Sequence, residues 1–384
     1  MKKIVILGST GSIGKQTLDV IRKNKKNFKI LLLTTNKNHI LLSKQIKEFK
    51  VKNVIINNRN CYEKIKKKFK YINVYRDFKK IDKIINNKAD YTMSAISGFE
   101  GLEPTLRVIK KTKVIAIANK ESIICGWDLI FKIAKKNNTK IIPVDSEHFS
   151  IFEIIKNHKI NDIKKIFITA SGGPFLNYSM KKLKKIKPKE ALNHPKWKMG
   201  KKISIDSSTL MNKILELIEA QKLFNISIKK LEILIHPDSL VHAIVQLKNG
   251  LTKIIFHETS MIIPLANAIF DNNLDISDFS KNNKKLQSDF QKNIIFKKLN
   301  SKTFPIIRIK GRLMEYPSTP IIINSANEVL VDQFLKKNIP FLGISKIIMD
   351  IMRDKNYRKY AIKSPLNLKK IFLIDKWTKN RILE

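Results

Sequence analysis

The first 150 residues alternate between short apolar runs and longer segments in which apolar residues recur every three or four positions. Short apolar runs are typical of buried parallel strands, and the longer period is typical of helices that pack on them. The apolar runs predict strands at 3–7, 29–35, 53–57, 91–96, 112–118 and 140–145. This alternation predicts an α/β fold whose N-terminal domain, over 1–150, is a doubly wound, mostly parallel (Rossmann-like) sheet.

The apolar runs come closer together after about residue 150. Asn249-Gly250, which separates two of them, is a strong hairpin signal. The runs predict further strands at 164–169, 231–236, 242–247 and 251–257. A second domain of α+β class is therefore expected over 151–270.

The remaining residues divide by composition. Residues 271–300 are polar and rich in Asn and Lys, which predicts a connecting segment. Residues 320–354 have a helical period, so a C-terminal helical domain is expected over 301–384.

Length and composition limit the class of protein. A chain of 384 residues is long enough for two or three domains with substantial cores. No apolar run approaches the ~20 residues that span a bilayer, so no membrane partner is expected. The N-terminus enters the predicted fold at once, which leaves no room for a signal peptide. Cys61 and Cys125 form no disulfide framework, and a bacterial cytoplasm is the expected location.

The net charge of +44 permits two interpretations. One is nucleic-acid binding. The other is compositional drift, because the lysines are spread along the chain and Ile, Lys and Asn dominate together, as an AT-rich genome would produce. No interleaved aromatic set resembles an RNA-binding sheet. The second interpretation is favoured, and no specific nucleic-acid partner is expected.

A glycine-rich turn follows the first predicted strand. Gly8, Gly11 and Gly14 lie in GSTGSIG, and a helical pattern begins directly after them. Glycines let the backbone approach a pyrophosphate, and the helix N-terminus offers free N–H groups. This predicts a dinucleotide cofactor. The spacing is G-x-x-G-x-x-G, so a tight turn without a ligand is the alternative.

The end of the second predicted strand bears on which cofactor binds. NAD-binding versions have a carboxylate there, whereas this chain has Asn36-Lys37-Asn38. A cation at this place suits a 2′-phosphate, which favours NADP. The alternative is that Lys37 is a solvated surface lysine.

Carboxylates in two segments could form a metal site. Asp145 and Glu147 are two residues apart, and Glu216 lies in the helical run Ser208 to Leu223. Carboxylates without cysteine partners suit a hard divalent cation, Mg²⁺ or Mn²⁺. Taken singly, each could equally be a surface carboxylate.

The same helical run could hold a phosphate. Asn212, Lys213 and Glu216 share one helical face, and Ser207 is expected near the start of that helix. A hydroxyl, an amide and a cation so placed suit an anion. The alternative is a capped helix with an ordinary Lys–Glu pair.

A loop over about 171–202 has the features of a lid. It begins with SGGPF and contains Trp197 in HPKWKMG, a polar stretch that ends at Gly200. A Trp in such a loop suggests a lid that excludes water from a site. The alternative is a Trp that anchors a structural loop.

These segments together resemble one family, 1-deoxy-D-xylulose 5-phosphate reductoisomerase. The resemblance is collinear and covers most of the chain. Its motifs are GSTGSIG at 8–14, NKN at 36–38, ANKES at 118–122, PVDSEH at 143–148, SGGPF at 171–175, HPKWKMG at 194–200, KISIDSSTLMNK at 202–213, LIHPDSLVH at 234–242 and NSANE at 324–328.

The resemblance implies a role for each site residue. Contacts to NADPH are implied for Thr10, Gly11, Ser12, Ile13, Asn36, Lys37, Asn38, Asn119, Glu121 and Gly200. Asp145, Glu147 and Glu216 would hold Mg²⁺ or Mn²⁺. The sugar phosphate would be bound by Lys120, Ser146, Glu147, Ser171, His194, Ser207, Asn212, Lys213 and Glu216. Catalytic roles are implied for Lys120 and Glu147.

The implied activity is the isomerisation and NADPH-dependent reduction of 1-deoxy-D-xylulose 5-phosphate to 2-C-methyl-D-erythritol 4-phosphate, in the non-mevalonate isoprenoid pathway. The resemblance also implies a homodimer, a catalytic domain at 151–270 and a loop that closes over the substrate. Other interpretations are an NADP oxidoreductase acting on a different phosphorylated substrate, against which the carboxylate set argues, and a basic nucleic-acid-binding protein that retains a nucleotide fold.

Two segments depart from the family pattern. Ile214 stands where the family usually has Gly, and its side chain is expected to crowd the helix against its neighbour. The family's Gly-x-Pro-Asp-Met-Arg appears here as HETSMI at 257–262, without the Asp and the Arg. This loss puts a structural ion pair or a dimer contact in doubt.

Overall fold

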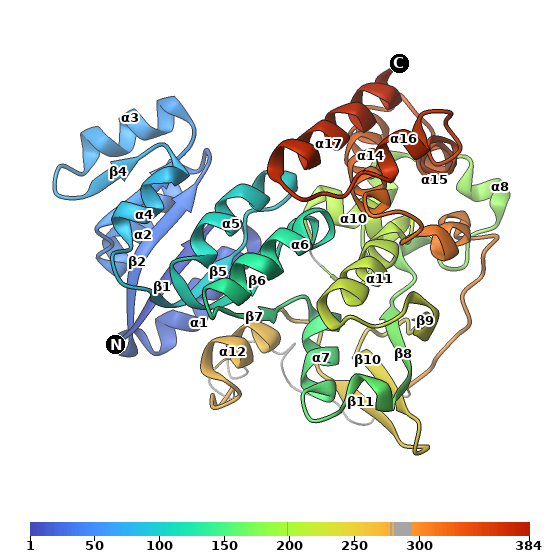
Figure 1. Cartoon of the computed structure of the whole chain (residues 1–384), viewed down its shortest axis with the longest axis horizontal. Coiled ribbons are helices and arrows are strands. Elements are labelled where there is room, and N and C mark those ends of the chain that lie inside the picture. The colour runs from blue at the N-terminus through green and yellow to red at the C-terminus, as the bar shows by residue number, and fades with distance from the viewer. Residues whose placement is uncertain (198, 277–278, 280–293) are drawn as a thin grey trace. The chain divides into compact units, whose positions relative to one another are not determined.

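The computed structural model describes residues 1–197, 199–276, 279 and 294–384. The chain forms two compact units (Figure 1). Unit 1 comprises Met1–Asp145 and Met261–Asp278, and unit 2 comprises Ser146–Ser260 and Phe279–Glu384. About half of the predicted connecting segment, 271–300, lies outside the described residues, and the predicted domain boundaries remain predictions.

Unit 1 contains a seven-stranded parallel sheet and its helices. Its elements are β1 Lys2–Leu7, α1 Ser12–Lys23, β2 Phe28–Thr35, α2 His39–Phe49, β3 Asn53–Ile56, α3 Arg59–Lys68, β4 Asn73–Tyr75, α4 Ile81–Ile84, β5 Ala89–Ser94, α5 Leu102–Ile109, β6 Thr112–Ile117, α6 Lys120–Lys136, β7 Lys140–Pro143 and α12 Ile262–Phe270. The sequence pattern missed β4 among these strands, because its three residues form a short, partly exposed edge.

The strand order is β4-β3-β2-β1-β5-β6-β7, and every pairing is parallel. Ile4 to Leu7 in β1 are fully buried, which explains why the central strand reads as a continuous apolar run. The order reverses between β1 and β5, so a crevice is expected at the carboxyl ends of these strands. The predicted doubly wound sheet is confirmed.

Unit 2 contains a four-stranded sheet and the C-terminal helices. Its elements are α7 Ser146–Ile155, β8 Ile163–Ala170, α8 Met180–Leu183, α9 Pro188–Ala191, α10 Lys201–Ser208, α11 Met211–Phe224, β9 Leu231–Ile235, β10 Val241–Leu247, β11 Thr252–Phe256, α14 Thr319–Leu335, α15 Phe341–Ile351, α16 Tyr357–Ala361 and α17 Leu368–Leu383.

The sheet of unit 2 has the order β11-β10-β8-β9. The β10–β11 hairpin is antiparallel, as Asn249-Gly250 predicts, and only β8 and β9 pair in parallel. Helices α7 and α11 pack against this sheet and against each other. Contacts of Glu147 with Lys213 and of His148 with Glu216 place the first turn of α7 beside the first two turns of α11, where several of the predicted site residues lie.

The C-terminal helices support α10 through buried polar contacts. Asn327 Nδ2 in α14 donates to Asp206 Oδ1 in α10 at 2.8 Å, and Lys202 pairs with Asp206 Oδ2 at 2.7 Å. Ser325 Oγ in α14 donates to Asp375 in α17 at 2.6 Å. The NSANE motif therefore holds helices together. Across the part of the chain that the structure describes, every helix is too short or too polar to cross a membrane.

Candidate active site

In the glycine-rich turn of unit 1, backbone segments lie too close together for side chains at two of the glycines. Gly8 has φ +79°, and a Cβ there would lie 2.6 Å from Ala95 O. A Cβ on Gly14 would lie 2.2 Å from Gly8 O. A side chain fits at neither position, so both glycines are required. Gly11 and Ser12 are exposed where α1 begins, which leaves the first turn of the helix open to an anion.

Side chains from β2 and α2 hold this turn in place. Thr34 Oγ1 accepts from Gly8 N at 2.8 Å, and Thr35 Oγ1 lies 2.6 Å from Thr10 Oγ1. Gln45 Nε2 donates to the carbonyl of buried Ser9 at 2.9 Å. A turn fixed by several bonds costs little further entropy when it binds a ligand.

The residues after β2 are exposed, as a cofactor contact requires. Asn36, Lys37 and Asn38 all face solvent. Asn38 also has a structural task, since its Oδ1 accepts from Leu41 N at 3.1 Å and caps α2. The carbonyl of Lys37 accepts from Cys61 Sγ at 3.1 Å, which leaves the ammonium of Lys37 outside that contact.

Asn119 is buried where β6 passes into α6, and its side chain makes hydrogen bonds to backbone groups of the protein. Its Nδ2 donates to the carbonyls of Ile96 and Gly98, and its Oδ1 accepts from Ser122 N at 2.5 Å. The next two residues are also buried, with Glu121 in the first turn of α6. Lys120 Nζ lies 3.3 Å from Asp145 Oδ2, which places the catalytic candidate beside a predicted metal ligand.

In unit 2, two predicted metal ligands meet around one ammonium group. Lys213 Nζ pairs with Glu147 Oε1 of α7 and, at 2.8 Å, with Glu216 Oε2 of α11. Asn212 Nδ2 donates to the other oxygen of Glu216, and Ser146 Oγ donates to Glu147 Oε2 at 2.6 Å. The pair of carboxylates thus already accepts a positive charge, and its oxygen donors fit a hard divalent cation. Asp145 ends unit 1, two residues before Glu147 in the chain.

The helix that carries these residues does not begin where the sequence predicts. One helix was expected over Ser208 to Leu223, with Ser207 near its start. Instead α10 ends at Ser208, and Leu210, with φ +66°, separates it from α11. Ser207 therefore lies in the last turn of α10, so the predicted capping role is wrong, and its place in the phosphate site stays a prediction. Ile214 is fully buried in α11, and the crowding expected from its side chain stays a prediction.

Ser171 and His194, both predicted to bind the sugar phosphate, lie within hydrogen-bonding distance of each other. His194 Nε2 lies 3.1 Å from Ser171 Oγ, and His194 Nδ1 accepts from Lys196 N and Trp197 N. The accepting Nδ1 assigns the proton to Nε2. Desolvation, and then the charge of Lys213, lower the pKa of His194 to about 4. The ring is therefore neutral near pH 7 and can donate one hydrogen bond.

The SGGPF turn lies against the end of α10. Gly173 has φ +62°, and a Cβ there would lie 2.9 Å from Ser207 O. This places the Ser171 turn beside Ser207. Much of the predicted lid, 171–202, packs into unit 2: Phe175, Leu183 and Ala191 are buried. The described residues 193–197 and 199–200 form no helix or strand, and the stretch 193–200 remains the lid candidate. A Cβ at Gly200 would meet nothing within 4 Å, so no steric need for glycine is found there.

Two histidine contacts were not anticipated from the sequence. His148 Nε2 lies 3.0 Å from the carbonyl of Glu216, and His148 Nδ1 lies 3.5 Å from Glu219 Oε2. This buried ring joins α7 to α11 and so sets the distance between Glu147 and Glu216. Its position directly after Glu147 in PVDSEH was the available signal. The second contact joins His242 and His257, which are 15 residues apart in the sequence. No short motif contains both residues, so the sequence pattern does not indicate this contact.

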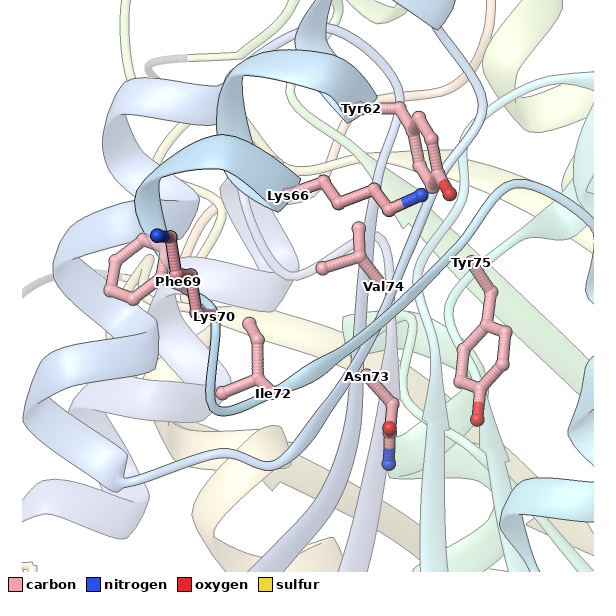
Figure 2. Close-up of a pocket in the computed structure, with 8 residues that line it drawn as sticks. All are labelled: Tyr62, Lys66, Phe69, Lys70, Ile72, Asn73, Val74 and Tyr75. Atoms are coloured by element: carbon pink, nitrogen blue, oxygen red, sulfur yellow. The ribbon is translucent and has the colours of Figure 1, made fainter.

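A separate hollow of about 440 Å³ lies on unit 1 between α3 and β4 (Figure 2). Its lining contains none of the predicted site residues. Lys66 extends over the ring of Tyr62, with Nζ 5.6 Å from the ring centre. The hollow adjoins the edge strand of the sheet, away from the glycine-rich turn that follows β1.

The fold and the site define an α/β enzyme with a nucleotide-binding unit and a carboxylate-lysine site. Models of the 1-deoxy-D-xylulose 5-phosphate reductoisomerase family match residues 4–126, its C-terminal domain 141–224, and a further C-terminal domain 257–381. The chain belongs to this family, and the resemblance seen in the motifs is confirmed.

Relatives of the same name match over nearly the whole chain. The 1-deoxy-D-xylulose 5-phosphate reductoisomerase of Pelagibacter ubique (strain HTCC1062) is 50% identical over 377 residues, covering 97% of this chain and 96% of its own. The protein of that name from Clostridium perfringens (strain 13 / Type A) is 40% identical over 382 residues, covering 96% and 97%.

Two solved structures have the same fold. The Zymomonas mobilis reductoisomerase, in complex with NADPH, has a TM-score of 0.86 at 32% identity and covers 99% of this chain and 98% of its own. A DOX-P reductoisomerase in complex with NADPH, fosmidomycin and magnesium has a TM-score of 0.90 at 30% identity and covers 100% and 98%. The predicted α/β fold class is therefore confirmed at the level of the whole chain.

Proposed function

We propose that this protein carries out the reaction for which its family is named. It converts 1-deoxy-D-xylulose 5-phosphate to 2-C-methyl-D-erythritol 4-phosphate, with NADPH as reductant and a divalent cation as cofactor. The observation that carries the proposal is the joining of Glu147 and Glu216 by Lys213, next to the Ser171–His194 pair. A simple nucleotide-dependent reductase has no need of this buried charged cluster.

Unit 1 would hold NADPH. The glycine-rich turn presents the open N-terminus of α1 to the pyrophosphate, and exposed Lys37 would pair with the 2′-phosphate. The buried carboxamide of Asn119 would act indirectly, by shaping the backbone at the start of α6. The NADPH complexes of the Zymomonas mobilis protein and of the DOX-P reductoisomerase support this assignment.

Asp145, Glu147 and Glu216 would hold the cation, Mg²⁺ or Mn²⁺. When bound, it supplies positive charge that polarises the substrate carbonyl and stabilises the oxyanion of the rearrangement. Lys120, 3.3 Å from Asp145, would hold a substrate hydroxyl or move its proton. The magnesium in the DOX-P reductoisomerase complex supports the choice of Mg²⁺.

The sugar phosphate would be held by Ser171, His194, Ser207, Asn212 and Lys213. Neutral His194 would donate to the phosphate through Nε2, and the ammonium of Lys213 would pair with it. The stretch 193–200 would then cover the substrate and exclude water.

Two copies of the chain would associate as a homodimer, and the cytoplasm would be its location.

The deciding experiment measures NADPH oxidation by the purified protein with 1-deoxy-D-xylulose 5-phosphate, with and without Mg²⁺. Turnover that requires both the sugar phosphate and the cation is expected. Oxidation with another sugar phosphate only, or without any cation, would favour a different NADP oxidoreductase. DNA retention at moderate salt without any turnover would favour a nucleic-acid-binding protein. Sedimentation of the same sample reports the oligomeric state.

A further inference from the structure

His242 and His257 form a stacked pair in unit 2. Their ring centres are 3.7 Å apart and the ring planes differ by 12°. His242 Nε2 donates to the carbonyl of His257 at 3.1 Å, and His257 Nδ1 donates to the carbonyl of Glu258 at 2.8 Å. Both rings are buried, with 2% of His242 and 9% of His257 exposed. The orientation of the pair is thus set by hydrogen bonds as well as by packing.

The backbone around the pair is shaped to produce this contact. The β10–β11 register shifts between Val241 and Ala243, so His242 is the extra residue of a β-bulge, a feature that re-aims a side chain. Thr169 Oγ1 of β8 donates to the carbonyls of Val241 and His242 at 2.5 and 3.1 Å, which holds the bulge. His257 follows the last residue of β11, and its N–H donates to the carbonyl of Leu240 at 2.9 Å.

His242 also contacts the lid candidate. Trp197 meets His242 edge to face, with ring centres 6.2 Å apart and an interplanar angle of 78°. Lys196 Nζ, one residue before, lies 3.0 Å from Asp238 Oδ1. Lys196 and Trp197 therefore make two contacts with this region, a charged one with Asp238, between β9 and β10, and an aromatic one with His242, in β10.

The contribution of His257 to the stack comes from its flat ring and its Nδ1 hydrogen bond. Its Nε2 is buried and has no hydrogen-bond partner among the described residues. A buried polar atom without a partner costs free energy, whereas an apolar ring of the same shape would avoid that cost.

We propose that His257 is a positioning residue of the sugar-phosphate site, acting through His242 on Trp197. Its flat ring stacks on His242 and fixes the position of that ring, and His242 in turn contacts Trp197. This inference rests on the proposed function, because the stretch 193–200 is assigned there to cover the substrate. Burial lowers the pKa of His257 to about 4, so the stack contains a neutral ring near pH 7.

The kinetic test compares His257→Leu, which removes the flat ring, with His257→Phe, which keeps one. His257→Leu should raise the KM for 1-deoxy-D-xylulose 5-phosphate about 2- to 12-fold, the equivalent of about 0.5–1.5 kcal/mol for an aromatic pair, and leave kcat and the KM for NADPH close to normal. His257→Phe should restore the normal KM. In a Trp197→Leu background, His257→Leu should have no further effect, because the path through Trp197 is already lost.

A second measurement needs no activity. In protein labelled with 5-fluorotryptophan, the ¹⁹F signal that Trp197→Phe removes belongs to Trp197. His257→Leu should shift and narrow that signal, whereas the signals of Trp127 and Trp377 stay in place as internal controls. An unshifted Trp197 signal overturns the proposal. Three kinetic results would overturn it as well. They are an unchanged KM for the sugar phosphate in folded His257→Leu, an equal rise in the KM for the sugar phosphate and for NADPH, and a KM that His257→Phe does not restore. Absence of turnover in the unaltered protein would contradict the proposed function instead. The ¹⁹F measurement would still show whether the His242–His257 stack fixes the position of Trp197.

Discussion

The ammonium of Lys213 lies 2.8 Å from the carboxylate of Glu216, one helical turn away on α11. It also pairs with Glu147 of α7. The residue expected to grip the substrate phosphate thus also neutralises two of the expected metal ligands. Substitution of Lys213 separates these two tasks, because only the first depends on the phosphate of the substrate.

Lys213→Met is expected to lower kcat/KM about 10- to 150-fold with the phosphorylated sugar. This corresponds to losing one charge-assisted contact of roughly 1.5–3 kcal/mol. The defect should nearly vanish with the dephosphorylated sugar, which never makes that contact, and the affinity for NADPH should stay normal. Steady-state kinetics with both sugars measures this, and exposed Lys229→Met is the matched control. Equal harm to both substrates would show that Lys213 serves the carboxylates instead.

Glu216→Gln is expected to abolish the response to Mg²⁺ and lower turnover more than about 100-fold without unfolding the protein. The substitution preserves shape but removes the negative charge of a fully buried side chain. Calorimetric Mg²⁺ titration and circular dichroism check both points. Glu232→Gln, on β9 and paired with Lys310 at 2.9 Å, is the control. Full activity of the unaltered protein after exhaustive chelation would contradict the metal assignment.

Lys37→Ala is expected to raise the KM for NADPH about 10-fold and to leave the KM for NADH nearly unchanged. Only NADPH carries the 2′-phosphate with which Lys37 would pair. Lys44→Ala, an exposed lysine on α2, should behave as the unaltered protein does. Equal use of both cofactors by the unaltered protein would refute the preference for NADPH.

Acid is expected to destabilise the protein partly through His257. Burial lowers its folded-state pKa from 6.5 to about 4, so the unfolded chain binds more protons between these values. The free energy of unfolding should therefore fall as pH drops from about 6.5 to about 4, by at most about 1.4 kcal/mol per pH unit for this one group. Urea unfolding across this range should show a shallower pH dependence in His257→Phe. Parallel curves for the two proteins would exclude the contribution.

The charge of +44 is expected to give only weak DNA binding without sequence preference. Counterion release alone produces such binding, and it weakens steeply as salt rises. Fluorescence anisotropy with unrelated duplexes should give equal affinities that vanish near physiological salt. A footprint at a defined sequence under those conditions would speak for a specific nucleic-acid role.

The sequence alone determined the nucleotide-binding half of this protein. Ile4 to Leu7 are buried on both faces of the sheet, so the central strand appears as an uninterrupted apolar run. Gly8 and Gly14 are required by backbone atoms that a Cβ would strike, so the turn is visible as a glycine pattern. Both signals are local, because each concerns residues a few positions apart.

The tertiary structure alone decided how the site of unit 2 is assembled. Glu147 and Lys213 are 66 residues apart and meet only because α7 packs on α11. The break before α11 lies at Leu210 and not at a glycine, so the sequence pattern predicts Ser207 near the start of a helix, whereas it lies in the last turn of α10. The His242–His257 stack depends on a β-bulge and on the end of a neighbouring strand. Such contacts arise from packing between elements. The periodicity of a segment indicates which of its faces is buried, but not which other segment packs against that face.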